Sequence, residues 1–399
     1  MNPKILIATL ILYAGSTVTS FAMFNYFSGA QKQAPVVVEF NEDGGLAIDP
    51  GEPRTEVCPL NGQKFTKTER AVWETRRPLA VMIENSVDAR PQSGIGSADI
   101  VYEAVAEGGV TRFMALMYCD AVSQDTLMAP VRSARTYFVD WASGYNQPMY
   151  AHVGGGNCSA DKLPNGGYGP CKSDKRAQAI EQISDYGWRL ESDIDGMSVG
   201  LPVYYRDYQR LGGNRQLATE HTMTTSTERL WTEASERDWT NTNPDGDEWL
   251  DDFIAWEFKD EAPEGERGSS QQISYDFWDG YKQYDVQWNY DPATNSYQRS
   301  MGGEAHIDLN TGDVISVKDV VVLLTEEIGP VDELKHMLYT TIGQGDALLF
   351  RDGKAEEIRW TKKNRTAPII FADKSGDEIE FTRGKIWISV IDENSEVGY

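Results

Sequence analysis

Arginine is concentrated, without lysine, in one long stretch of this sequence. No lysine occurs between Lys67 and Lys162, whereas seven arginines do. A guanidinium keeps its charge when partly buried, and its planar fork fits a carboxylate or a phosphate. The stretch therefore predicts either a site that binds an anion or a set of buried ion pairs. The seven are Arg70, Arg76, Arg77, Arg90, Arg112, Arg132 and Arg135.

The segment PVRSAR brings two of these arginines close together. In a helix, Arg132 and Arg135 would lie on one face. In a loop, the hydroxyl of Ser133 and backbone N–H groups could join them. We place the predicted ligand-binding site around this segment. Its predicted members are Asp88, Arg90, Arg112, Arg132, Ser133, Arg135, His152 and His221.

Glu103 and Glu107 are the candidates for acid–base chemistry. Their spacing of four places them on one face of a helix, and an even spacing does the same in a strand. Two neighbouring carboxyls can share a proton and serve as general acid or base. The alternative is that they pair with Arg112 or Arg132 and have a structural role.

The histidines give little support for a metal or cofactor site. His152 precedes three glycines, where backbone can approach a ligand closely, and His221 follows Glu220. No HExxH or HxH spacing supports a two-histidine metal site. The glycines of residues 154–156 lack a nucleotide-binding fingerprint, and Ser133 lacks a GxSxG elbow. We therefore predict neither a metal nor a cofactor.

The net charge excludes some classes of partner. The 399 residues include 37 Lys+Arg and 62 Asp+Glu, for a net charge of −25. A protein that binds nucleic acid needs a surplus of basic residues to neutralise phosphates, and a helix that binds anionic lipid needs the same surplus. The cysteines show no CxxC spacing, which argues against zinc ribbons and thioredoxin-type motifs.

The N-terminus predicts export. Ile5–Phe27 is an uncharged apolar run of 23 residues, preceded by Lys4. It fits a single membrane anchor with the body outside the cytoplasmic membrane. The alternatives are a signal peptide cleaved at residues 28–30 and a buried helix. Export permits disulfides. A bridge between Cys158 and Cys171 would staple a loop, and Cys119 fits a bridge or a buried thiol equally well.

The pattern along the chain predicts two domains after the anchor. Short apolar runs, typical of strands, alternate with helical segments in the first, and alternating strands with turn signals fill the second. Residues 99–107 fit a helix or a strand, and 173–186 a helix. The expected fold is α/β (α+β), followed by a mostly antiparallel β domain. The expected segments are 1–30 signal anchor, 31–74 linker, 75–240 α/β domain, 241–272 acidic joint and 273–395 β domain.

Long strings in both halves carry a family likeness. The first half contains PLAVMIENSVDARPQSGIGSADIVYEAVAEGGVTRFMALMY, PVRSARTYFVDWA and AHVGG, and the second contains NYDPATNSYQRSMGGEAHIDLNTG and GDEIEFTRGKIWISV. The chain resembles the YerB-like bacterial lipoproteins, a family with domains of unknown function. The resemblance implies an exported protein held by a lipid-modified cysteine, with no established activity. This sequence departs there, because its first cysteine is Cys58. The anchor would then be Ile5–Phe27.

Three functions fit these observations. The first is binding of an anionic cell-envelope polymer through the arginines. The second is an envelope hydrolase or transferase, with Glu103 or Glu107 as general acid or base. The third is a scaffold for a membrane protein, with the charged cluster purely structural.

Overall fold

The apolar runs of the first half form the expected strands. They are β3 (Leu79–Glu84), β4 (Ile100–Glu107), β5 (Val110–Met117) and β7 (Met149–His152). A further strand, β8 (Asp193–Asp195), was not expected, because no apolar run marks it. Nearly all of their residues are buried, as continuous apolar strands covered on both faces require. Residues 99–107 are thus a strand and not a helix.

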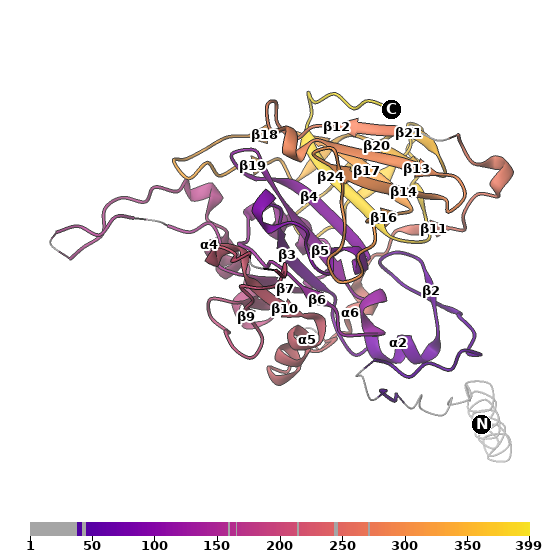
Figure 1. Cartoon of the computed structure of the whole chain (residues 1–399), viewed down its shortest axis with the longest axis horizontal. Coiled ribbons are helices and arrows are strands. Elements are labelled where there is room, and N and C mark those ends of the chain that lie inside the picture. The colour runs from indigo at the N-terminus through magenta and orange to yellow at the C-terminus, as the bar shows by residue number, and fades with distance from the viewer. Residues whose placement is uncertain are drawn as a thin grey trace, which may run out of the picture. The chain divides into compact units, whose positions relative to one another are not determined.

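Strands of the second half extend the same sheet in the computed structural model. They are β17 (Asp319–Thr325), β20 (Gly343–Arg351), β21 (Lys354–Lys362), β22 (Ile370–Ala372) and β24 (Ile386–Asp392). The ten strands have the order β22-β21-β20-β17-β24-β4-β5-β3-β7-β8. In Figure 1 the purple strands of the first half continue into the yellow and orange strands of the second.

One sheet therefore runs through both halves, and the expected separate β domain does not have a separate main sheet. The junction is β24, which pairs in parallel with β17 on one side and with β4 on the other. The C-terminal strand fills the gap between two sets of strands that are distant in sequence. The fold is mostly β with short helices, so the α/β expectation for the first half holds only in part.

A second sheet covers one face of the large sheet. It contains β12 (Gln272–Tyr275), β13 (Val286–Asp291), β14 (Ser296–Met301), β15 (Glu304–Ala305) and β16 (Ser316–Val317). Trp288 of this sheet packs edge-on against Trp387 of β24, with ring centroids 5.5 Å apart. Burial alternates along β12 and β13, as expected for strands with one face toward a core.

The opposite face is covered by α3 (Thr136–Ser143). Trp141 of this helix stacks on Tyr102 of β4 at 5.7 Å, and the Tyr137 hydroxyl donates to the Val105 carbonyl. The other α-helices of the described residues are α2 (Lys67–Trp73), α4 (Ala179–Asp185), α5 (Thr227–Glu236) and α6 (Trp249–Asp252). The predicted helix over 173–186 is thus confined to α4 and a preceding 3-10 turn at Lys175–Ala177.

The stretch expected to be a linker contains ordered elements. It includes β1 (Glu56–Val57), β2 (Lys64–Phe65) and α2. A capping box explains the start of α2, because the Thr66 side chain accepts from the Glu69 backbone and the Glu69 side chain accepts from the Thr66 backbone.

The remaining strands form small sheets. They are β6 (Leu127–Met128), β9 (Tyr205–Arg206) and β10 (Met223–Ser226), then β11 (Glu257–Lys259) with β23 (Glu380–Thr382), and β18 (Glu327–Ile328) with β19 (Leu338–Tyr339). Further 3-10 turns are Val87–Ala89, Ile95–Ser97, Asp120–Val122, Trp188–Leu190, Thr219–His221, Glu264–Glu266 and Lys282–Tyr284.

Two disulfides close loops of different length. Cys58 pairs with Cys119 across 61 residues, and Cys158 pairs with Cys171 across 13. The second pair is the staple that the flanking loop suggested. The interpretation of Cys119 as a buried free thiol is wrong.

The structure describes residues 38–41, 45–158, 160–164, 166–213, 215–242, 246–269 and 272–399. The expected anchor Ile5–Phe27 lies outside these residues. Within them, no helix combines the length and the apolar character needed to span a membrane.

Candidate functional site

The carboxyl ends of four strands meet at one edge of the large sheet. β3 is parallel to β7, which is parallel to β8, and β4 has the same direction because both β3 and β4 are antiparallel to β5. The last residues of these strands are Glu84, Glu107, His152 and Asp195. Open sheets of parallel strands often place ligands at this edge. The fold thus gathers acids and a histidine that are distant in sequence.

The PVRSAR segment runs along the same edge in an extended conformation. The Arg132 amide donates to the Met82 carbonyl, and the Ala134 amide donates to the Gly154 carbonyl, both at 2.9 Å. Helix α3 begins only after Arg135, its N-cap residue. The helical alternative for Arg132 and Arg135 is therefore wrong, because this segment hydrogen-bonds to its neighbours instead of to itself.

Glu107 bridges two arginines at this edge. Its Oε1 accepts from Arg112 at 2.9 Å, and its Oε2 accepts from Arg135 at 2.6 Å. Burial alone would raise the pKa of Glu107, but the charges of Arg112 and Arg135 outweigh it and lower that pKa to about 2. Glu107 is thus ionised throughout the physiological range, which makes it a poor general acid or base.

Glu84 holds the third arginine and a histidine. Its Oε1 lies 3.4 Å from Arg132 Nε and 2.9 Å from His221 Nδ1. The side chain of Glu84 is buried, while that of Arg132 is about a quarter exposed. Three arginines therefore face two carboxylates at this edge, and each arginine has a carboxylate partner.

His152 is a charged structural residue in this arrangement. Its Nδ1 lies 2.7 Å from the Gly154 carbonyl, and its Nε2 lies 2.7 Å from Asp193 Oδ1. Both partners accept hydrogen, so both ring nitrogens carry one. Burial alone would lower the pKa of His152, but the Asp193 hydrogen bond and the charges of Asp193 and Asp195 raise it above its ordinary value.

Gly156, one of the three glycines after His152, allows close packing of the backbone. A side chain at Gly156 would lie 2.2 Å from the Ala177 carbonyl, so this glycine lets the chain approach itself closely.

Glu103 faces the other side of the sheet from Glu107. The register of β4 shifts between Val105 and Glu107, where one extra residue forms a β-bulge. An extra residue exchanges the two faces of a strand from that point on. The expectation that both glutamates share a face is therefore wrong.

Glu103 belongs to a sealed network between the two sheets. Its Oε2 accepts from Arg299 of β14 at 2.5 Å, and its Oε1 accepts from the Thr111 hydroxyl at 2.9 Å. Both partners of the ion pair are fully buried. Burial raises the pKa of Glu103, while the charge of Arg299 opposes that rise. This carboxyl meets no solvent and no cleft, so it is poorly placed for catalysis.

The network continues through a neutral histidine. Arg299 Nη1 donates to His306 Nδ1 at 2.7 Å, and His306 Nε2 lies 2.9 Å from Gln92 Oε1. Because Nδ1 accepts from arginine, the hydrogen is on Nε2. Burial and the charges of Arg299 and Arg90 lower the pKa of His306 well below its ordinary range.

Arg90 lies in a different environment from the other predicted arginines. It donates to the backbone and side-chain oxygens of Asn85 and to the Gln283 carbonyl, and its guanidinium lies 4.8 Å from the Tyr284 ring centroid. Burial lowers the pKa of Arg90 to about 10. No carboxylate of the described chain lies within ion-pair distance of it.

Arg90 lines a cavity of about 320 Å³ between the two halves of the chain. Arg215 also lines it and lies 3.4 Å from Asp88, whose side chain is largely exposed. Two arginines thus line the cavity. Arg215 has a carboxylate partner, whereas Arg90 has none among the described residues. Its other lining residues are Val87, Pro91, Met301, Glu304, Ala305, His306 and Ile307.

The predicted site residues therefore fall into three groups. The first group lies at the carboxyl edge and consists of Glu107, Arg112, Arg132, Ser133, Arg135, His152 and His221. In the second, Arg90 lines the cavity and Asp88 pairs with Arg215 of its wall. The third is Glu103, which lies between the sheets. At the edge, the Ser133 carbonyl accepts from Arg112 at 2.8 Å.

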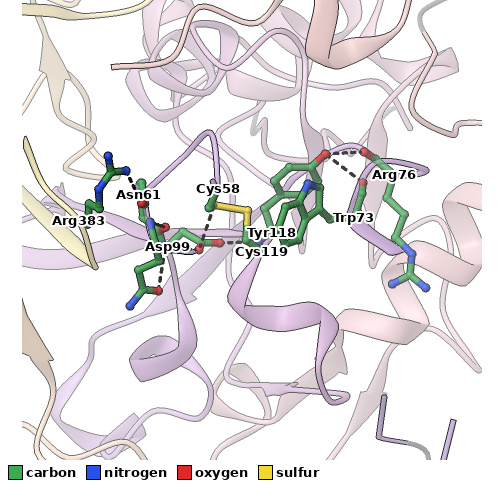
Figure 2. The surroundings of a disulfide bond; sticks show 10 residues. Cys58, Asn61, Trp73, Arg76, Asp99, Tyr118, Cys119 and Arg383 are labelled. Atoms are coloured by element: carbon green, nitrogen blue, oxygen red, sulfur yellow. Dashed lines mark hydrogen bonds between the residues drawn. A yellow bond between two sulfur atoms is a disulfide. The ribbon is translucent and has the colours of Figure 1, made fainter. Parts of the chain in front are cut away.

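One group of potential metal ligands gathers near the longer disulfide. Ligand atoms of Cys58, Asp99 and Cys119 lie within 4.8 Å of one another. Figure 2 shows that the two sulfurs are bonded together and that Asp99 accepts from Asn61 and from the backbone of Tyr118. Because the thiols are used in the disulfide, these residues do not fit a metal ion.

Sequence reasoning missed the partners that decide these roles. Arg299 and Glu84 were not among the predicted site residues, although each holds a predicted one. Both stand at positions without a motif. Glu84 ends an apolar strand at a polar residue, which was the only signal for it.

Comparison with known proteins identifies relatives of this chain. Residues 65–240 match the N-terminal domain, and residues 273–388 the C-terminal domain, of the family described as "Protein of unknown function (DUF3048)". The chain is 28% identical over 337 residues to the protein named "Putative lipoprotein YerB" of Bacillus subtilis (strain 168), covering 84% of this chain and 86% of that protein. The crystal structure of YerB protein from Bacillus subtilis shares the fold, with a TM-score of 0.64 and 24% identity over 86% of this chain and all of that one. The two family matches together span most of the sequence, and the chain belongs to the DUF3048 family of proteins of unknown function.

Proposed function

We propose that this protein is anchored outside the cytoplasmic membrane and binds an anionic component of the cell envelope at Arg90. The component carries a carboxylate, as in a wall peptide, or a phosphate, as in a wall polymer. The sequence predicted anion binding by arginines of the PVRSAR segment. We keep anion binding by arginine but place it at the cavity that Arg90 lines.

Three observations support the location. The relative from Bacillus subtilis is named as a lipoprotein. The chain has two disulfides, which form and persist in oxidising compartments outside the cytosol. The sequence of Ile5–Phe27 suits a membrane anchor in place of a lipid-modified cysteine.

The observation that carries the proposal is the unmatched charge of Arg90. A half-buried cation is costly unless it is both paired with an anion and hydrogen-bonded. Arg90 has only neutral acceptors, namely Asn85 and the Gln283 carbonyl. It adjoins a cavity whose size of about 320 Å³ suits a small group. A ligand carboxylate or phosphate would supply the missing charge and a charge-assisted hydrogen bond.

The edge arginines support binding less well. Arg112 and Arg135 share the Glu107 carboxylate, and Arg132 adjoins Glu84. The loop between β18 and β19 also crosses this point, because the Gly108 amide donates to the Lys335 carbonyl. These contacts favour a structural role for the edge cluster.

The two carboxyls that the enzyme alternative requires, those of Glu103 and Glu107, are poorly suited to acid–base catalysis. The low pKa of Glu107 keeps it ionised, and the Arg299 pair seals Glu103 between the sheets. No observation of the described residues favours that alternative over binding.

Co-sedimentation with wall material tests the proposal. The full-length protein, kept soluble in detergent, is mixed with isolated bacterial cell walls, either intact or stripped of phosphate polymers. We expect saturable retention that falls roughly 10- to 100-fold in affinity in Arg90→Gln, because hydrogen bonds to a charged group contribute about 1.5–3 kcal/mol. Stripped walls distinguish phosphate from peptide carboxylate.

Lys354→Gln is the matched control for this experiment. It removes one exposed positive charge at a hairpin away from the cavity. Equal retention of the wild type and of both variants would contradict a role for Arg90. Equal loss in both variants would indicate attraction by net charge alone.

A further inference from the structure

A second cavity, of about 280 Å³, lies on the α3 face of the large sheet and is separate from the Arg90 cavity. Its walls are the loop that follows α3, the Tyr186–Trp188 turn, the chain after α6 and the loop of residues 364–368 between β21 and β22. Its volume is close to the lower end of small-molecule pockets, about 300 Å³. The cavity therefore suits one ring-sized ligand better than a polymer segment.

Arg365 supplies a fixed positive group in this cavity. Its guanidinium lies over the Tyr186 ring, 4.0 Å from the centroid, and Nη1 donates to the Ser143 hydroxyl at 3.2 Å. No carboxylate of the described chain lies within ion-pair distance of Arg365. A guanidinium that is held by a ring and a hydroxyl is preorganised to bind a carboxylate.

One wall of the cavity, the loop after α3, offers hydrogen-bond acceptors. Asn146 and Gln147 both line the cavity, and their side-chain NH2 groups are used by the Trp249 carbonyl at 3.1 Å and by Glu191 at 2.8 Å. No donor among the described residues reaches their amide oxygens. These oxygens can accept hydrogen bonds from ligand hydroxyls.

The backbone under this wall is strained. Asn146 and Gln147 have φ values of 51° and 56°, which non-glycine residues seldom adopt. The buried Arg77 holds this conformation, since it donates to the Gln147 carbonyl at 3.1 Å and to two further carbonyls. Strain that the surrounding structure maintains is a common feature of binding sites.

The cavity also has an apolar side. Phe253 and Ile254 line it, and 60% of the Ile254 surface is exposed although it is a large aliphatic residue. The C–H face of a sugar ring packs well against such a surface, while its hydroxyls require the polar wall.

We infer that this cavity binds a single acidic sugar, with the sugar carboxylate on Arg365 and its hydroxyls on the amide oxygens of Asn146 and Gln147. The site is independent of the Arg90 cavity. The cavity supplies one cation for the carboxylate, two amide acceptors for hydroxyls and one apolar side for the ring. The exposed Asp252 also lines the cavity and can accept a hydrogen bond from a further ligand hydroxyl.

Calorimetric titration of the full-length protein with three probes tests this inference. Glucuronate has the ring, the hydroxyls and the carboxylate, glucose lacks the carboxylate, and acetate lacks the ring. We expect glucuronate to bind at least tenfold more tightly than either of the others. Arg365→Gln should weaken glucuronate binding at least tenfold, whereas Lys363→Gln, the neighbouring exposed lysine that does not line the cavity, should leave it unchanged.

Two further variants make the result decisive. Thr366→Tyr adds bulk at an exposed residue that lines the cavity and should block glucuronate even if Arg365→Gln disturbs the loop. Arg90→Gln should retain glucuronate binding, which separates this site from the proposed function. No glucuronate binding, equal binding of glucose or acetate, or equal weakening by Lys363→Gln would each overturn the inference.

Discussion

The buried pair between Glu103 and Arg299 predicts a large and specific loss of stability. Both side chains are fully buried, and Nη2 of the arginine lies 2.5 Å from Oε2 of the glutamate. Glu103→Gln keeps the shape of the side chain but leaves the arginine charge without a carboxylate. Removing one partner of a buried pair costs about 3–5 kcal/mol. We expect the free energy of unfolding to fall by that amount.

The neighbouring contacts prevent glutamine from compensating. The Thr111 hydroxyl accepts from Asn85 at 2.6 Å and donates to Glu103 Oε1 at 2.9 Å. If the oxygen of a glutamine faced Arg299, its NH2 group would replace the oxygen that now accepts from the Thr111 hydroxyl and would face the Asn85 NH2 group, which lies 3.4 Å from Oε1. The variant therefore loses one hydrogen bond in addition to the compensating charge.

Urea denaturation of the full-length protein, followed by tryptophan fluorescence, measures the effect. Glu74→Gln is the matched control, because it breaks an exposed 3.0 Å pair with Arg70 and should cost below about 0.5 kcal/mol. Adding Arg299→Met to Glu103→Gln removes the unpaired charge and should recover part of the loss. An unfolding free energy for Glu103→Gln within about 0.5 kcal/mol of the wild type would refute the structural role and return Glu103 to the candidates for chemistry.

Three further predictions concern disulfides and pH. Alanine replacement of both Cys58 and Cys119 should lower the unfolding free energy by about 4 kcal/mol, and removal of the Cys158–Cys171 bridge should lower it by about 3 kcal/mol. The difference is expected because the first bridge closes a loop of 61 residues and the second a loop of 13. The reverse order of the two losses in urea titrations would contradict this. Burial raises the pKa of Asp319 to about 7, so the folded state retains a proton that the unfolded state loses, and stability falls as pH rises from about 4 to about 7. Asp319→Asn should match the wild type at pH 4 and exceed it at pH 8 by up to about 4 kcal/mol, a gain that identical pH profiles would exclude. The raised pKa of His152 stabilises the fold below about pH 6.5, and this stabilisation is lost as pH rises through the folded-state pKa. The loss of unfolding free energy in His152→Gln should therefore become smaller as pH rises. A loss that is the same at every pH would count against a charged imidazole.

Local patterns in the sequence predicted local structure well. The apolar run at Leu79–Ile83 forms β3, and the Asp352–Gly353 pair forms the turn between β20 and β21. Both turn residues have positive φ, 50° and 69°, as a two-residue type I′ hairpin requires. These features depend on neighbouring residues, which the sequence displays directly.

Long-range pairing could not be predicted in the same way. Residues 386–392 have the pattern of any buried strand, and nothing in it indicates that β24 pairs with β4, nearly 300 positions earlier. No residue pattern indicates the bulge near Val105 either, yet this bulge places Glu103 and Glu107 on opposite faces of the sheet. The choice between an unpaired and a paired arginine likewise depends on which acids the fold brings near, as Arg90 and Arg112 show.

Titration with small anions tests whether Arg90 binds an anionic group. Inorganic phosphate and acetate are added separately to the full-length wild type, to Arg90→Gln and to Lys354→Gln, with binding followed by calorimetry. We expect saturable binding of at least one anion at one site, weakened roughly 10- to 100-fold in Arg90→Gln and unchanged in Lys354→Gln. Anion binding that is equal in all three proteins, or absent from the wild type, would contradict it.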